Sequence, residues 1–308
     1  MASTLVEPQA PAPPSVSHHW GTDALLLLMA LIWGVNFIVV KLGAQLLQPL
    51  AFNGGRVAIA AVSLVLIVVA MREPWPAWRD ARALLLLGVL GNGLYQWFFI
   101  EGIARTRAGD AALVLAASPA LMAIIGRMLG VEQVTPRKIL GIGASLLGMA
   151  LVVFGSGKAD PATTRDVATL AGNMLVLAAC FCWALYTVLL KPYTERTHGM
   201  HLSAITMVGG AVPLLLVSAP ALATTAWHAA TPAAWGAVAY SSLGALVIAY
   251  LIWYRGVRII GPTRTAMYGN LQPVVALAVA WLTFSEIPSG IQFAGAAAIM
   301  AGIVMTRG

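Results

Sequence analysis

Charge is scarce in this chain. Only 9% of its 308 residues are Asp, Glu, Lys or Arg, whereas about 25% is usual in a soluble domain, and 60% are hydrophobic. The mean hydropathy is +0.85. So little charge cannot cover the surface of an ordinary water-soluble domain, and the composition therefore indicates an integral membrane protein.

Cysteine and N-terminal basic residues are also rare. The two cysteines, Cys180 and Cys182, lie two apart in one apolar run, where they do not share a helix face, so a disulfide between them is not expected. Residues 1–21 contain no Lys or Arg and are rich in Pro and Ala. We expect a disordered tail without the basic region of a signal peptide, followed by a retained first helix. His18 and His19 in this tail have no further ligand nearby, and we expect no metal site there.

Familiar catalytic motifs are absent. The chain has no HExxH, GASLLG at 143–148 departs from the spacing of GxSxG, and GSGK at 155–158 lacks the first glycine of a P-loop. We therefore expect no enzyme activity, no cofactor and no ATP-driven mechanism. A polytopic membrane enzyme or a channel is kept as the alternative from a different class, although a channel would call for rings of pore-lining charge.

Apolar runs fill the rest of the sequence. A run of about 20 apolar residues can cross a hydrocarbon core of about 30 Å as a helix. The short connections leave no room for a soluble domain. The predicted fold class is an all-α membrane protein with ten transmembrane helices, at 23–43, 50–71, 82–103, 109–129, 137–155, 169–190, 201–219, 233–254, 263–283 and 289–306.

The basic residues are distributed unevenly between the connections. With a cytoplasmic N-terminus, twelve fall inside, which are Arg72, Arg79, Arg82, Arg127, Arg137, Lys138, Lys191, Arg196, Arg255, Arg258, Arg264 and Arg307. Five fall outside, which are Lys41, Arg105, Arg107, Lys158 and Arg165, and Arg56 is left within the second run. The positive-inside bias predicts that both termini are cytoplasmic. The net charge of +7 is thus a topology signal, and the expected partner is the lipid bilayer, with no nucleic acid.

The sequence repeats itself. Gly102, Pro119, Glu132, Gly141 and Gly148 are separated by 17, 13, 9 and 7 residues, and Gly256, Pro273, Glu286, Gly295 and Gly302 have the same separations. We predict two five-helix repeats, 22–156 and 157–308, around a central cavity. Because five is odd, the second repeat enters the membrane from the opposite side, and such inverted repeats are typical of transporters.

These residues carry a family resemblance. WGVNF at 33–37 with Lys41, the two Pro to Glu pairs and the glycine-rich last helix of each half resemble the drug/metabolite transporter superfamily, in its ten-helix EamA-type branch. Within it the chain is similar to the YddG-type amino-acid exporters of bacterial inner membranes. The resemblance implies a secondary transporter that exports amino acids by alternating access. Drugs, sugars or nucleotide-type metabolites remain alternative substrates, because this superfamily moves all of them through one architecture.

Polar and aromatic side chains at mid-membrane depth are the candidates for a substrate site. Polar groups there are costly unless they are buried in protein or face water. Single amides can also serve only as contacts between helices, and that alternative stays open for each. An amino-acid zwitterion needs hydrogen-bonding groups and aromatic faces, so we expect broad selectivity that leans to aromatic or large apolar amino acids. The candidates are Trp33, Asn36, Asn92, Tyr95, Gln96, Trp183, Tyr186, Tyr250, Tyr268, Asn270 and Gln272.

Two prolines and a set of small residues complete the prediction. Pro119 and Pro273 each remove a hydrogen bond within a predicted helix, and breaks at equivalent places in two halves point to a midplane site. Small residues on the fifth and tenth helices are expected to pack the two halves together or to form a dimer contact. We expect a monomer, with a dimer as the alternative. The small residues are Gly141, Ser145, Gly148, Gly295 and Gly302.

Overall fold

Helices make up the regular structure of the protein. A computed structural model describes residues 20–130, 136–155, 164–260, 268–269, 271–285 and 289–306, and these ranges contain no strand. The tail 1–19, Glu132, Asn270 and Glu286 lie outside the described residues. The all-helical class predicted from the sequence is confirmed for the described ranges.

The helices of the first half follow the predicted runs closely. Pro49 begins the second helix, where its fixed backbone angle suits the first turn. The third run is continuous but changes from α to π and back to α. The elements are α1 (Trp20–Leu46), α2 (Pro49–Met71), α3 (Trp78–Gly88), η1 (Val89–Leu94), α4 (Tyr95–Arg105), α5 (Ala108–Ala116), α6 (Ser118–Met128) and α7 (Pro136–Gly155).

The second half shows the same irregularity at the corresponding place. When Gly102 is aligned with Gly256, the π-helix η1 corresponds to residues 243–248, which lie inside the π-helix η3. The elements are α8 (Thr164–Thr194), α9 (Gly199–Thr224), η2 (Trp227–Ala229), α10 (Pro232–Ala239), η3 (Tyr240–Ile248), α11 (Ala249–Ile260), α13 (Leu271–Phe284) and α14 (Gly290–Thr306).

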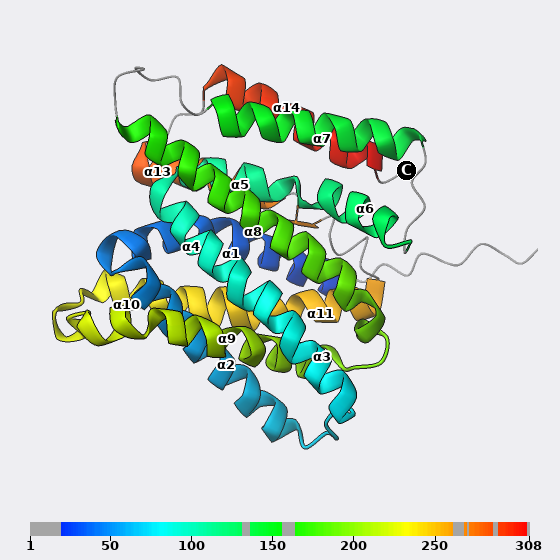
Figure 1. The fold of residues 1–308 in the computed structure, drawn as a ribbon, viewed down its shortest axis with the longest axis vertical. Coiled ribbons are helices and arrows are strands. Elements are labelled where there is room, and N and C mark those ends of the chain that lie inside the picture. The colour runs from blue at the N-terminus through cyan, green and yellow to red at the C-terminus, as the bar shows by residue number, and fades with distance from the viewer. Residues whose placement is uncertain are drawn as a thin grey trace, which may run out of the picture.

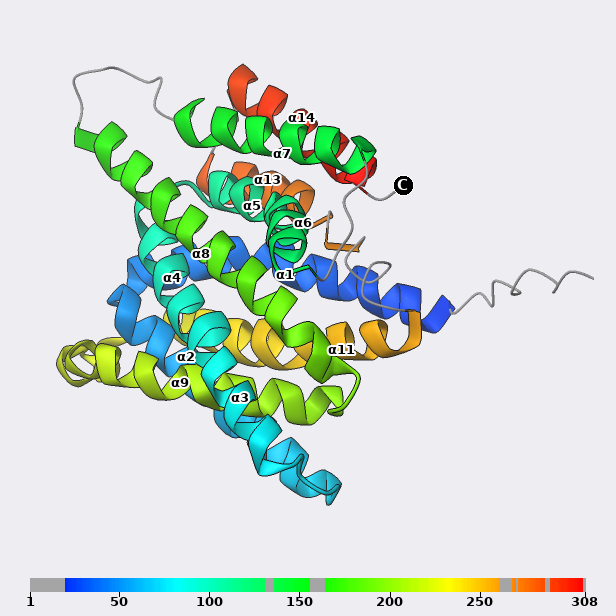
Figure 2. The ribbon, with the colours of Figure 1, turned by 45° about the vertical axis from the view of Figure 1, so that its right-hand side comes forward.

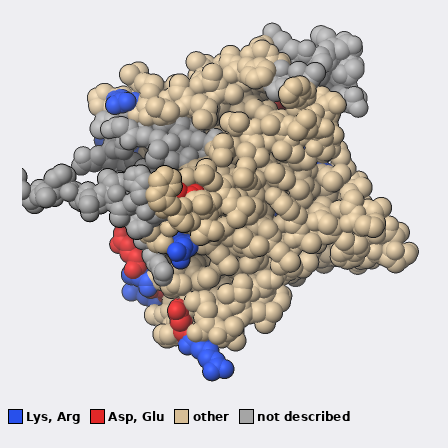
Figure 3. All heavy atoms as spheres, turned by 180° about the vertical axis from the view of Figure 1, so that it is seen from behind, with Lys and Arg blue, Asp and Glu red and all other residues tan. Residues whose placement is uncertain are grey.

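The surface is that of a protein in lipid. Within the described residues, seven helical segments are long and apolar enough to cross a membrane, and three shorter apolar helices span Ile139–Val152, Leu271–Phe284 and Gly290–Gly302. Large apolar side chains point outward along the spans, among them Leu66, Leu86, Leu147, Leu216 and Leu282. On the face in Figure 3, most of the visible charged side chains lie along one side of the molecule. The chain is a multi-pass membrane protein.

Packing between helices recurs in equivalent pairs. The last helices of the two halves, α7 and α14, lie side by side in Figures 1 and 2, and α2 packs against α9. Helices α4 and α6 of the first half pack on α8. Their counterparts in the second half, α11 and α13, pack on α1, which is the counterpart of α8. In these pairs, a helix of the first half meets the second half as its counterpart meets the first half.

The contact between α7 and α14 depends on small residues, as the sequence predicts. A Cβ atom added to Gly148 would lie 2.5 Å from the Gly295 carbonyl oxygen, and one added to Gly302 would lie 2.4 Å from that of Gly141. Such close backbone approach requires glycine. These residues join the two halves within one chain.

Candidate functional site

A buried arginine lies where three helices meet. Arg56 of α2 is 1% exposed. Its Nε donates to Asn53 Oδ1 (2.9 Å), one terminal nitrogen to Ser241 Oγ of η3 (2.9 Å) and the other to Gln96 Oε1 of α4 (2.6 Å). Asn53 Nδ2 in turn donates to the Gln96 backbone carbonyl at 3.0 Å. The guanidinium therefore ties α2, α4 and η3 together.

This arginine has no carboxylate partner among the described residues. Its three hydrogen-bond partners are neutral. The centre of the guanidinium lies 5.7 Å from the centroid of the Phe52 ring, and Tyr95 and Tyr250 are also neighbours. A guanidinium has five N–H donors, so two are left for another ligand. A charge buried at membrane depth without a counter-ion is costly, and such residues mark substrate or ion pathways.

Arg56 is not among the residues predicted from the sequence for the substrate site. A signal was present, because an Arg seven residues inside an apolar run is a functional candidate by that fact alone. The predicted candidates are all neutral Trp, Tyr, Asn or Gln side chains.

The candidates of the first and eighth predicted helices form one aromatic group. Trp33 of α1 contacts Tyr250 edge to face, with ring centroids 5.8 Å apart, and Trp253 at 5.7 Å. The Trp33 indole N–H donates to the Ala245 carbonyl of η3 at 2.9 Å. The π-helix thus supplies the acceptor that fixes the Trp33 ring.

A second aromatic group comes from the third and sixth predicted helices. Tyr95 of α4 lies 5.4 Å from the Trp183 ring of α8, and Trp183 lies 5.6 Å from Tyr186. Tyr95 also stacks on Phe99 at 5.8 Å. Trp33, Trp183 and Tyr250 all belong to the apolar cluster between α2, α9 and α11.

Two amides near these rings keep an unused polar atom. Asn36 Oδ1 and Asn92 Nδ2 are buried without a hydrogen-bond partner. Asn92 Oδ1 accepts a hydrogen bond of 3.5 Å from the Tyr250 hydroxyl. Buried polar atoms usually have partners, so one acceptor and one donor are available here to a polar ligand.

The remaining candidates make contacts that do not involve Arg56 in the described hydrogen bonds. Tyr268 donates to Asp23 in the first turn of α1 at 2.7 Å. The Gln272 backbone packs against Gly34 of α1, and Pro273 lies in the first turn of α13. Near Pro119, α5 ends at Ala116 and α6 begins at Ser118, so the span is interrupted just before the proline.

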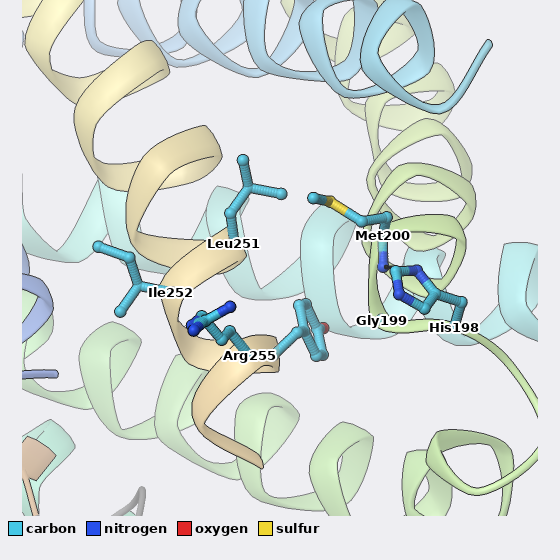
Figure 4. Close-up of a pocket in the computed structure, with 7 residues that line it drawn as sticks. His198, Gly199, Met200, Leu251, Ile252 and Arg255 are labelled. Carbon is cyan, nitrogen blue, oxygen red and sulfur yellow. Dashed lines mark hydrogen bonds between the residues drawn. The ribbon is translucent and has the colours of Figure 1, made fainter. Parts of the chain in front are cut away.

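A cavity of about 240 Å³ opens beyond the aromatic groups. It lies between the start of α9 and the first half of α11, and Figure 4 shows His198 on one wall and Arg255 on the other. Tyr254, which lines it, lies 6.2 Å from the Tyr250 ring. Aromatic contacts thus run from this cavity through Tyr250 to the neighbourhood of Arg56.

Comparison with known proteins identifies the family of the chain. Residues 20–154 and 170–308 each match the EamA-like transporter family. An uncharacterized transporter of Bacillus subtilis, YyaM, is 25% identical over 292 residues, covering 94% of both chains. A probable amino-acid metabolite efflux pump of Salmonella typhimurium is 26% identical, covering 91% of this chain and 92% of its own. A solved crystal structure with 19% identity and a TM-score of 0.61 covers 93% of this chain and 96% of its own, which shows a common fold. The chain belongs to the EamA-like transporter family.

Proposed function

We propose that the protein exports amino acids across the bacterial inner membrane, with Arg56 as the group that binds the substrate carboxylate. The observation that carries this proposal is the buried Arg56 guanidinium, held by three neutral partners and lacking a carboxylate partner among the described residues. Arginine suits this task because its planar fork donates two parallel hydrogen bonds to a carboxylate.

The aromatic groups suit the other end of an amino acid. The faces of Trp33, Trp183 and Tyr250 attract an ammonium group, and Asn36 Oδ1 can accept a hydrogen bond from it. The same rings provide apolar contact for a large side chain. A site of this kind favours aromatic or large apolar amino acids. The name of the Salmonella relative, an amino-acid metabolite efflux pump, supports the same substrate class.

Transport is proposed to occur by alternating access between two inverted five-helix repeats that form ten membrane spans. Support comes from the family match to each half, the π-helix at the same place in each half and the paired helix contacts. In this scheme both termini are cytoplasmic, and the cavity between α9 and α11 opens to the cytoplasm. The contact of α2, α4 and η3 around Arg56 closes the other side. We propose that a monomer is sufficient.

Counterflow into proteoliposomes that contain only this protein tests the function. The panel pairs phenylalanine and leucine with phenethylamine, which lacks the carboxylate, and adds a sugar and a nucleotide. Exchange of the two amino acids, without exchange of phenethylamine, is the expected result. Exchange of the sugar or the nucleotide alone would assign the protein to another substrate class of the superfamily.

A further inference from the structure

Three metal-ligating side chains meet at one end of the molecule, away from Arg56. Glu73, His198 and His201 each offer a ligand atom, and these atoms lie within 4.8 Å of one another. Local structure brings them together. The chain leaves α2 through Arg72 in the left-handed conformation (φ 54°), which places Glu73 in the α2–α3 connection. His198 is the N-cap of α9, and His201 follows three residues later on the same side of the helix.

A second observation concerns His201. Its side chain is 2% exposed, and its Nε2 atom has no hydrogen-bond partner. The ring is fixed by the edge-to-face contact with Trp75, at 5.3 Å between centroids, and by the His198 ring at 6.2 Å. A buried polar atom without a partner is energetically costly. A ligand at this place would remove that cost.

We propose that Glu73, His198 and His201 bind a divalent transition-metal ion, with Zn²⁺ as the best match. Two imidazoles and one carboxylate are a common zinc donor set, which leaves the fourth position of the tetrahedron to water. His198 Nδ1 lies 3.9 Å from Glu73 Oε2, and ligands about 2.0–2.1 Å from zinc lie about 3.3 Å apart. The three ligand atoms lie within 4.8 Å of one another, so side-chain movements of up to about 1.5 Å bring them to this spacing. The ion then replaces the 3.4 Å hydrogen bond that His198 Nδ1 accepts from the Met200 N–H.

The site is accessible and balanced in charge. The Glu73 and His198 side chains are 46% and 33% exposed, so an ion can reach them from the aqueous side. The carboxylate offsets part of the charge of the ion, and both imidazoles bind as neutral groups. In the orientation proposed above, this end faces the cytoplasm.

The place of the site gives the ion a function. His198 and the two residues that follow it line the cavity between α9 and α11 (Figure 4). An ion shared with Glu73 joins the start of α9 to the α2–α3 connection. Because the cavity wall cannot then move independently of α2, the bound ion slows transport.

Zinc binding is measured first, by equilibrium dialysis of the full chain purified without a histidine tag. The expected result is one Zn²⁺ per chain, with affinity lowered at least about 10-fold in His201→Ala and in Glu73→Gln. His201→Cys keeps a zinc ligand and should bind more tightly than His201→Ala. The matched controls are His228→Ala, an exposed histidine in η2, and a double replacement of His18 and His19. Both should bind like the parent protein.

Two results would overturn the site. One is unchanged zinc affinity in His201→Ala that elutes as a folded species in size-exclusion chromatography, and the other is loss of binding in the tail variant. The effect on transport is read as the ratio of counterflow with and without zinc in each variant. Zinc should slow the parent protein and the His228 control but not His201→Ala. Equal slowing in all three proteins would show that zinc acts at another place. If zinc does not slow the parent protein, the proposed effect of the ion on transport is refuted.

Discussion

Replacing Arg56 with methionine is expected to remove recognition of the carboxylate while the protein stays folded. Methionine fills much of the same space, but it leaves the side-chain oxygens of Asn53, Gln96 and Ser241 without their donor. Each orphaned atom costs about 1–3 kcal/mol. Removing the buried charge also removes its desolvation penalty of several kcal/mol, which offsets much of this loss. The thermal midpoint of unfolding should therefore shift by less than about 10 °C.

The loss in substrate binding should be larger. Removing one partner of a buried, hydrogen-bonded charge pair costs about 2–5 kcal/mol, which corresponds to about 30- to 4,000-fold in affinity. Arg56→Lys keeps the charge but lacks the planar fork, and it should fall between the parent and Arg56→Met. The half-saturating concentration of phenylalanine in counterflow is the quantity to measure.

A comparison with phenethylamine isolates the carboxylate. The parent protein should prefer phenylalanine, whereas Arg56→Met should treat the two compounds alike, because the only difference between them is the group that Arg56 binds. If Arg56→Met keeps the preference of the parent, Arg56 is a structural contact between helices and the proposed recognition is refuted.

Three further outcomes follow from the structure. Gly148→Ala should lower the free energy of unfolding by about 1–3 kcal/mol, because its Cβ meets the backbone of α14, whereas Gly143→Ala, with nothing within 4 Å, should be neutral or slightly stabilising in the same thermal melts. Trp183→Ala should reduce counterflow without changing the elution volume in detergent, and normal transport by this variant would remove Trp183 from the site. A cysteine at Gly308 should resist labelling from outside intact cells while one at Ala223 reacts, and the reverse pattern would invert the proposed orientation.

The helices were predictable because apolar runs of membrane length leave little choice of structure. The predicted runs 50–71 and 289–306 agree with α2 and α14 to within a residue or so. The π-helices η1 and η3 were not predicted, although the run around Gly91 and Gly93 is rich in small residues. Their extra residue per turn depends on packing against other helices, such as the approach of Gly91 to Tyr186 and of Gly210 to Asn92.

The candidate site was predictable only in part. Aromatic residues such as Trp33 and Trp183 stood out, because they lie too deep for the interface. The partners of Arg56 come from three helices, and their meeting depends on tertiary packing that no local pattern encodes. The same holds for Glu73 and His201, which are 128 positions apart (201 − 73) in the sequence.

The two π-helices allow a helix to turn about its own axis without breaking. A π-turn holds one residue more than an α-turn, through hydrogen bonds from i to i+5, and one residue of an α-helix corresponds to about 100° of rotation. The π segment η1 can shift along its span by one turn. The residues that it passes then rotate to another face of the helix. Almost every backbone hydrogen bond is kept, because a bond to i+4 is replaced by one to i+5 or the reverse. Asn92 lies in η1 and Ser241 in η3, so both could swing toward or away from the substrate. The span would then change conformation by rotating about its own axis, without bending.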